Sequence, residues 1–136
     1  MIRDLHILAM GGPNAPIFAG HFRGEFGKEE PASIGAGGHQ APIKDVVARE
    51  MLDFVEWLNA ATEADFGGQY LAARAFLDFV KLHPVPDGNG RTARLLLAVI
   101  LRRHGLPALQ LEEGDRSTLN GHLRQATTVV GSELRL

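Results

Sequence analysis

The sequence predicts a mainly α-helical domain that carries one short β-hairpin. Apolar residues recur at helical spacing in most of the chain, which is the pattern of helices packed on a core. Residues 11–41 are rich in glycine and show no sustained helical pattern, so the hairpin is expected there, over about 30–41. The 136 residues, 45% hydrophobic and 22% charged, suit a single globular domain over 1–136.

Two helices are expected in the first half of the chain. The first covers 2–10 and ends at the glycines and proline of 11–13. Pro42 is interpreted as the first residue of the second helix, and Asn59 and the glycine pair at 67–68 mark the break after it. The inner face of this second helix has apolar residues three, four or seven positions apart: Val47, Met51, Phe54, Val55 and Leu58.

The second half of the chain predicts three more helices. One runs from Tyr70 to His83, where prolines at 84 and 86 end it. Its inner stripe is Ala72, Phe76, Phe79 and Val80. The next helix, 91–104, is apolar on nearly every side, as a helix at the centre of a domain is, and Gly105 is its expected C-cap. A last helix is expected over about 115–130.

The composition excludes several classes of function. The chain has no cysteine, so disulfides, zinc–thiolate sites and thiol nucleophiles are excluded. The net charge is −2 and there is no long basic run, which disfavours a nucleic-acid partner. The longest apolar run, 95–101, is too short for a membrane span, and no signal-peptide core follows the first residues. We therefore expect a protein with no membrane partner, in the cytoplasm of the producing cell or, if it is an effector, of a host cell.

The segment 83–94, HPVPDGNGRTAR, joins two of the predicted helices. Its Asp-Gly and Asn-Gly pairs are typical of hairpin turns, but both flanks have helical and not alternating periodicity. Glycines that open directly onto a helix present unpaired N–H groups and the positive end of the helix dipole to an anion. Arg91 and Arg94 lie one turn apart, about 4.5 Å along the helix axis, and suit neighbouring phosphates.

Two further side chains complete this phosphate site. Asp87 offers one carboxylate to Mg²⁺, with phosphate oxygens as further ligands. His83, at the end of the preceding helix, is placed to act as a general base. Each residue alone is more often structural, but a base, a metal ligand, a backbone cradle and a cationic clamp within one short segment indicate chemistry on nucleotide phosphates. The segment is not a P-loop, because no GxxxxGK[ST] occurs.

The same segment resembles the motif of the Fic family, H-P-F-x-[DE]-G-N-G-R-x-x-R. The one departure is Val85, where the family usually has a phenylalanine that packs in the core. The resemblance extends over a core of about 5–109: AGHFR at 19–23 resembles the family's P-G-x-[FY]-R element, and residues 34–35 and 39–42 resemble its flap hairpin. Doc-type kinases lack the second glycine, whereas Gly90 is present here, so the chain resembles the protein adenylyltransferase branch.

The resemblance implies a Fic-type helical domain with a hairpin flap, transferring AMP from ATP to a Ser, Thr or Tyr hydroxyl of a target protein. His83 would take the hydroxyl proton, and Asp87 would hold Mg²⁺. Arg91 would bind the β-phosphate and Arg94 the γ-phosphate. The α-phosphoryl oxygens would be stabilised by the backbone N–H groups of Gly88, Asn89 and Gly90 and by the Asn89 side chain. The flap would dock the target by strand addition through Pro31, Ala32, Ser33, Ile34 and Gly35.

Regulation and donor identity leave alternatives open. Many Fic proteins carry an inhibitory [ST]-x-x-x-E-[GN] helix, which this sequence does not show. The chain is then a toxin restrained by a separate antitoxin that presents a glutamate to Arg94, an unrestrained effector, or a piece of a larger protein; the first is preferred. Leu119 and Asn120 replace the family's tyrosine pair near the nucleobase, so UMP or phosphocholine transfer stays open. A nucleotide-binding module without turnover is the other alternative, and a metal hydrolase is disfavoured because no histidine or carboxylate cluster lies nearby.

Overall fold

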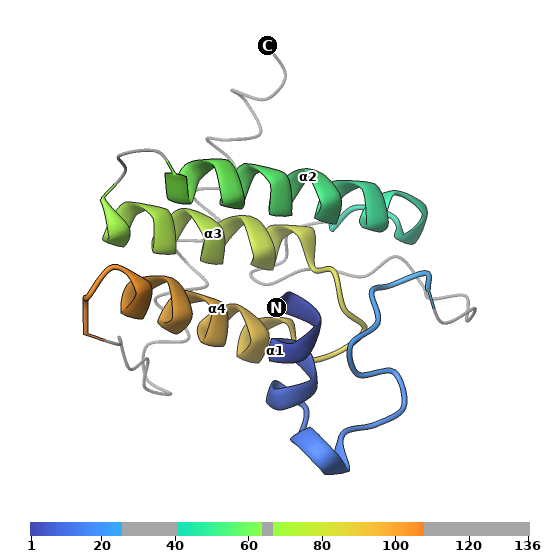
Figure 1. The fold of residues 1–136 in the computed structure, drawn as a ribbon. Coiled ribbons are helices and arrows are strands. Elements are labelled where there is room, and N and C mark those ends of the chain that lie inside the picture. Colours follow the sequence, from blue (N-terminus) through green and yellow to red (C-terminus); the bar gives the residue numbers. More distant parts are fainter. Residues whose placement is uncertain (26–40, 64–66, 108–136) are drawn as a thin grey trace.

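A computed structural model describes residues 1–25, 41–63 and 67–107, and the side chains of all of these except 62 and 63. The elements in these ranges are α1 (Ile2–Ala9), the short 3-10 helix η1 (Gly12–Asn14), α2 (Lys44–Glu63), α3 (Gly68–Leu82) and α4 (Asn89–Arg103) (Figure 1). The expected mainly helical fold is confirmed. The predicted helix over 115–130 and nearly all of the predicted flap, 30–41, lie outside the described residues.

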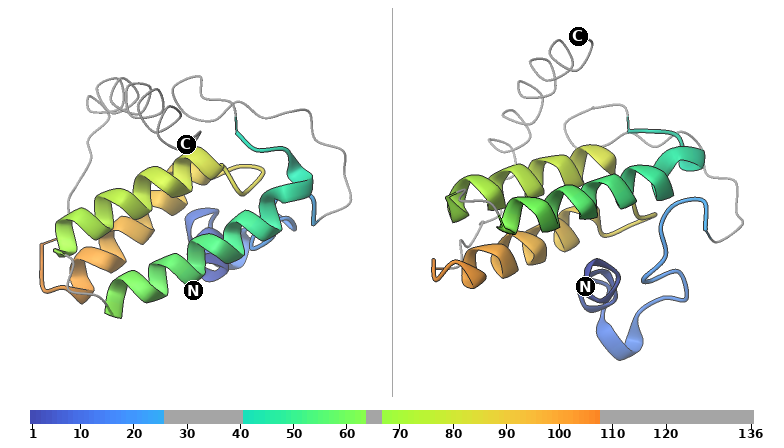
Figure 2. Two further views of the ribbon diagram at one scale, coloured as in Figure 1. Left: turned by 90° about the horizontal axis from the view of Figure 1, so that it is seen from above. Right: turned by 45° about the horizontal axis from the view of Figure 1, so that its top comes forward.

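Three long helices form the body of the described structure. α3 packs against α2 on one side and α4 on the other, and α1 packs against α4. Successive helices run in opposite directions, as the colours along α2, α3 and α4 show (Figures 1 and 2). The connection between α3 and α4 therefore lies at one end of the layer, and α1 crosses near the start of α4 at that same end (Figure 1).

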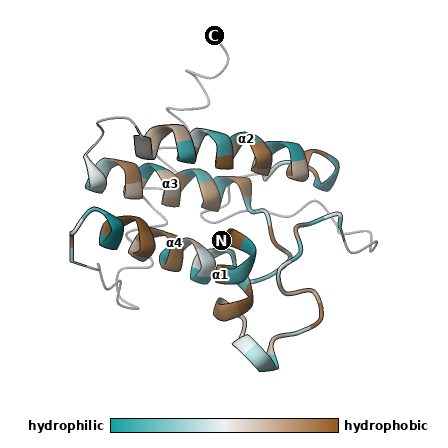
Figure 3. Ribbon diagram, viewed as in Figure 1, coloured by the Kyte–Doolittle hydropathy of each residue, from teal (hydrophilic) through white to brown (hydrophobic). Residues whose placement is uncertain are grey.

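The apolar faces that the sequence predicts form the core. On α2, Val47, Met51, Phe54 and Leu58 are buried and Val55 is partly buried; on α3, Ala72, Phe76, Phe79 and Val80 are buried. Phe79 meets Phe54 edge to face with ring centroids 6.2 Å apart, which joins α3 to α2. Apolar and polar residues alternate around each helix accordingly (Figure 3). The helices therefore form because each buries one stripe against its neighbours.

Helix ends differ from the predicted ones by a few residues. α2 begins at Lys44 and not at Pro42, whose carbonyl accepts a hydrogen bond from Arg23 instead (2.8 Å). Asn59 does not end α2, because it lies on the exposed face while buried Leu58 and Ala61 continue the inner stripe. Local signals for a helix end are weak beside the burial of the next turn.

α4 packs against both α3 and α1. It begins at Asn89, two residues before the predicted start, because Gly88 adopts a left-handed conformation (φ +85°) and serves as the N-cap. It ends at Arg103, one residue before the predicted end, with His104 as the C-cap and Gly105 left-handed just after it (φ +69°). Arginines are exposed in its first turns and at its end, while Leu96 and Ile100 are buried between them. In the described ranges, no helix is both long and apolar enough for a membrane span.

Candidate functional site

His83 terminates α3 in an uncommon backbone conformation. It is the C-cap residue, with φ +49° and ψ +55°, and no other non-glycine residue in the described ranges has a positive φ. Its N–H donates to the carbonyl of Phe79 (3.0 Å), which closes the last turn. The left-handed step turns the chain sharply out of the helix, and the imidazole is left partly exposed with Nδ1 buried. With Nδ1 buried, Nε2 is the candidate nitrogen for proton transfer.

Asn89 holds the loop between His83 and α4 in shape. Its side-chain oxygen accepts the N–H of Val85 (3.0 Å), and its amide donates to the carbonyl of Val85 (2.7 Å). Both residues are buried, and Val85 fills the position that the family motif gives to phenylalanine. The geometry therefore uses the Asn89 side chain to close the loop, and the group of Asn89 that faces a ligand by helix geometry is its backbone N–H.

The N-terminus of α4 has the features of an anion site. The N–H groups in the first turn of any helix lack an intrahelical acceptor, and here no side chain caps them. The carbonyl of Gly88 is bound twice by Thr92, from its N–H (2.9 Å) and from its hydroxyl (2.7 Å), which fixes the first turn. Gly90 is exposed next to it, where an anion would approach the backbone.

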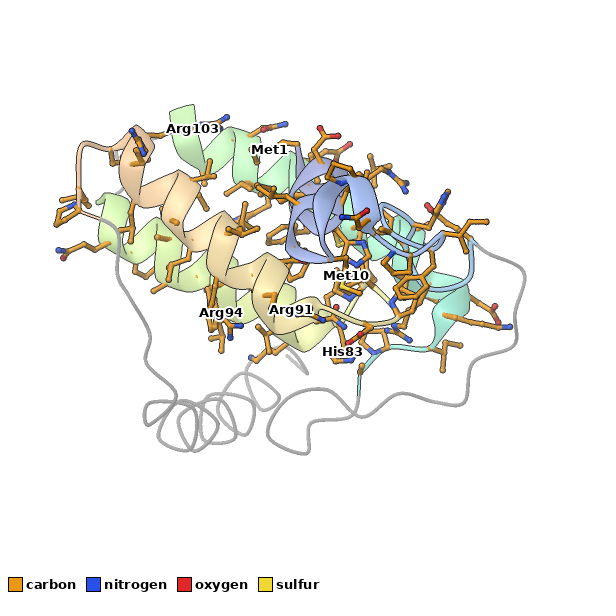
Figure 4. The ribbon with its side chains drawn as sticks, turned by 90° about the horizontal axis from the view of Figure 1, so that it is seen from below. Met1, Met10, His83, Arg91, Arg94 and Arg103 are labelled. Atoms are coloured by element: carbon orange, nitrogen blue, oxygen red, sulfur yellow. The ribbon has the colours of Figure 1, made fainter. Side chains whose placement is uncertain are left out.

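Two arginines flank this helix end on the same side as His83 (Figure 4). Arg91 is half-exposed and reaches the carbonyl of Ala9 on α1 (3.5 Å). Arg94 is exposed, and its Nη1 lies 3.6 Å from where a Cβ on Gly90 would be, so the guanidinium lies over the start of the helix. Among the described residues, Arg94 has no hydrogen-bond or ion-pair partner. Its charge is therefore directed to the surface beside the first-turn N–H groups.

Asp87 is the carboxylate of the site. Its Oδ1 accepts the N–H of Gly88 (2.8 Å), and its Oδ2 lies 3.5 Å from Arg91 Nη2. The side chain is 67% exposed, so lone pairs on both oxygens stay accessible. No set of three histidine, cysteine or carboxylate side chains that suits a metal occurs in the part of the chain that the structure describes. One exposed carboxylate fits an Mg²⁺ ion whose further ligands are phosphate oxygens and water.

His6 on α1 supports the loop through a hydrogen bond to its backbone. The sequence does not single out this residue. The Gly20 N–H donates to Nδ1 of His6 (2.9 Å), so Nε2 carries the proton and donates to the Asp87 carbonyl (2.9 Å). His6 is fully buried, and Met10 packs so closely on Gly88 that a Cβ there would lie 2.5 Å from the Met10 sulfur. Glycine at position 88 therefore suits both this close contact and the left-handed φ of +85°.

The structure brings most of the predicted site residues together and leaves one group outside the described ranges. His83 and the segment from Asp87 to Arg94 gather at one end of the helical layer, as the sequence predicts (Figure 4). The predicted flap residues Pro31, Ala32, Ser33, Ile34 and Gly35 are not among the described residues. His6 was missed, although its place four residues after buried Ile2 on an apolar face is a signal that could have found it.

The buried His6 predicts a pH dependence of stability. Burial lowers the pKa of His6 below its ordinary value of 6.5, so the unfolded chain binds a proton more readily than the folded one. The free energy of unfolding should therefore fall as the pH drops below 6.5, until the pKa of the folded state is passed. Urea unfolding between pH 8 and 5 measures this step.

A matched pair of variants tests that assignment. His6→Asn keeps an acceptor and a donor but removes the titration, so it should flatten the step above pH 5. His104→Gln, at the far end of α4, should keep it. Glu25 is separable, because the hydrogen bond from Arg3 lowers its pKa below the ordinary 4.5, and its contribution is lost only in more acid solution. An unchanged pH profile in His6→Asn would contradict the role of His6.

Comparisons with known proteins identify this arrangement. The sequence model of the Fic/DOC family matches residues 1–101. The proteins named protein adenylyltransferase Fic of Drosophila willistoni and Drosophila virilis are each 34% identical to the chain over 125 residues, which is 92% of the chain and 24% of each relative. The chain thus spans about a quarter of the length of these relatives.

Solved structures give the same result. A Fic domain-containing signalling protein from Bacteroides thetaiotaomicron matches with a TM-score of 0.77 and 27% identity, over 93% of this chain and 47% of that one. Fic-1 from C. elegans matches with a TM-score of 0.70 and 31% identity, over 93% of this chain and 34% of that one.

Proposed function

The chain belongs to the Fic/DOC family, and we propose that it transfers AMP from ATP to a Ser, Thr or Tyr hydroxyl of a target protein. The observation that carries the proposal is the grouping of a partly exposed histidine with two arginines around an uncapped helix N-terminus (Figure 4). The names of the Drosophila relatives support the same reaction.

The proposed reaction gives each side chain of the site a role that suits its position in the structure. Nε2 of His83 takes the proton of the target hydroxyl as that oxygen bonds to the α-phosphorus of ATP. The bond from that phosphorus to the bridging oxygen breaks, and pyrophosphate leaves. First-turn N–H groups of α4 stabilise the charge on the α-phosphoryl oxygens, and Arg91 and Arg94 bind the β- and γ-phosphates. Mg²⁺ at Asp87 would neutralise phosphate charge.

The position of Arg94 also suits control by a partner. Its guanidinium is exposed and is directed to the surface, so a glutamate from another helix would compete with the γ-phosphate for it. We propose a separate antitoxin chain as the source of that glutamate, and the segment 31–35 as the docking place of the target. Both proposals concern groups that lie outside the described structure.

A labelling experiment tests the reaction. The protein is incubated with lysate proteins, Mg²⁺ and ATP labelled at either the α- or the γ-phosphate. Adenylyl transfer predicts protein-bound label from the α position and none from the γ position, and mass spectrometry of the labelled proteins gives the added group and the modified residue. Label from the γ position would indicate a kinase. An added mass of UMP or phosphocholine would indicate another donor, and ATP binding with no modified protein would indicate a binding module.

Arg94 offers a second, binding-based prediction. Lysine at position 94 keeps the charge but loses the planar fork that binds a phosphate with two hydrogen bonds, so Arg94→Lys should weaken Mg–ATP binding about tenfold. Isothermal titration calorimetry measures this. Arg102→Lys, an exposed substitution in the last turn of the same helix, is the matched control and should bind as the wild type does. Equal affinity in both variants would exclude Arg94 as a phosphate ligand.

A further inference from the structure

We infer that Arg23 is a positioning residue for His83, and that it sets the direction in which the proposed base points. The inference rests on the proposed function, in which His83 takes a proton. Arg23 lies far from His83 in sequence and is almost completely buried, with 3% of its surface exposed. Its side chain donates to backbone carbonyls.

The Arg23 side chain forms hydrogen bonds with the peptide groups on both sides of the His83 Cα. Its Nη2 donates to the carbonyl of Leu82 (3.1 Å), and its Nε donates to the carbonyl of His83 (2.5 Å). These two oxygens belong to the peptide groups before and after the His83 Cα. Fixing both peptide planes fixes φ and ψ of the residue between them, and so the direction of its Cα–Cβ bond.

A third contact extends this grip to the next residue. The backbone N–H of Arg23 donates to the carbonyl of Pro84 (2.7 Å), so three consecutive carbonyls are held by one residue. Nη2 also donates to the carbonyl of Pro42 (2.8 Å), just before α2, which holds the guanidinium itself in place. The planar fork of arginine suits several fixed acceptors at once, whereas a lysine ammonium would not span them with the same geometry.

The left-handed backbone of His83 explains why these hydrogen bonds from Arg23 are needed. A left-handed backbone costs a residue with a side chain about 1 kcal/mol or more, and the carbonyls at the end of a helix lack intrahelical donors. The Arg23 guanidinium at the C-terminal end of α3 donates to those carbonyls, and its positive charge interacts favourably with the negative end of the helix dipole. Without the Arg23 side chain, the backbone bond to Pro84 remains but the Leu82 and His83 carbonyls lose their donors. We then expect the backbone of His83 to relax toward ordinary conformations and the imidazole to move away from the site.

The proposed phosphate-binding part of the site has supports of its own. The first turn of α4 is held by Thr92 and Asn89, and the Asp87 carbonyl is held by His6. Loss of Arg23 should therefore misplace the base while ATP still binds. That separation distinguishes a positioning role from general loss of the fold.

The test compares Arg23→Lys and Arg23→Ala with the wild type. We expect each to lower kcat for AMP transfer by about 10²-fold, the effect of a misplacement on the order of 1 Å, and to change the dissociation constant of Mg–ATP by less than about threefold. Millimolar methylguanidinium should partly restore kcat in Arg23→Ala by occupying the vacated site. Arg3→Gln is the control: it breaks the Arg3–Glu25 pair that anchors the same turn but does not touch 82–84, and its kcat should stay within about threefold.

A readout without turnover keeps this inference separate from the reaction. The Cα and amide chemical shifts of His83 report its left-handed backbone, and they should move toward ordinary values in both Arg23 variants but not in Arg3→Gln. If the wild type transfers no group, the proposed function fails, and the shifts still decide the role of Arg23. A wild-type kcat or unchanged His83 shifts in folded Arg23→Lys would overturn it, as would equal losses of kcat and ATP affinity. If Arg23→Ala does not fold, Arg23→Lys alone decides.

Discussion

Replacement of His83 is expected to lower the rate of AMP transfer by about 10²–10⁴-fold, or about 3–5 kcal/mol of activation free energy. The reason is that Nε2 of the imidazole is the proposed acceptor of the hydroxyl proton, and none of the proposed phosphate ligands is on that ring. The affinity for Mg–ATP should therefore change little. Single-turnover transfer from α-labelled ATP, together with calorimetry, measures both quantities.

The choice of variant matters because His83 has a left-handed backbone. Alanine there adds a conformational cost of about 1 kcal/mol, whereas asparagine adopts this conformation more readily and does not act as a base. His83→Ala and His83→Asn should thus lose the same activity, with less destabilisation in His83→Asn. His104→Ala, at the far end of α4, is the control and should transfer AMP at the wild-type rate. Wild-type transfer by His83→Asn would remove the base from the mechanism.

Phe79→Ala should produce the largest loss of stability, about 3–5 kcal/mol. Phe79 has no exposed surface, packs edge-on against Phe54, and its carbonyl accepts the N–H of His83. The cavity would therefore open between α2 and α3, in the last turn of α3. Because small domains unfold at a cost of about 5–15 kcal/mol, this is a large fraction of the total. Urea unfolding at fixed pH measures it.

An exposed residue on the neighbouring helix provides the comparison. Leu52 on α2 is 59% exposed, so Leu52→Ala should change the free energy of unfolding by less than about 0.5 kcal/mol. If Phe79→Ala cost less than about 1 kcal/mol, or no more than Leu52→Ala, the α2–α3 contact would not be the core that the structure describes.

The helices could be predicted because their evidence is local and periodic. The spacing of apolar residues on α2 and α3 predicts the buried stripes, and those residues are found in the core. Helix ends were less predictable. Pro42 has the local character of a first helical residue, yet its carbonyl is held by Arg23 from a different part of the chain.

The grouping of the candidate site residues could be predicted for a similar reason, since they are close in sequence. Any loop of this composition leading into a helix places His83, Asp87 and the two arginines within one short segment. The short segment does not reveal which hydrogen bonds hold the loop in its conformation. Asn89 reads as a ligand in the motif, but its side chain binds the backbone of Val85 across the loop.

The sequence by itself determined that this chain is a helical Fic-family domain, and it predicts that the chemistry is centred on residues 83–94. Both properties are encoded by spacing along the chain, which a single sequence records. Tertiary structure alone decided that His6 and Arg23 hold this segment, because both act through backbone carbonyls. Every residue has a carbonyl, so no pattern of residue types marks which one will be bound. The fold brings α1 and the 20–25 turn against the loop, and that contact directs the proposed base.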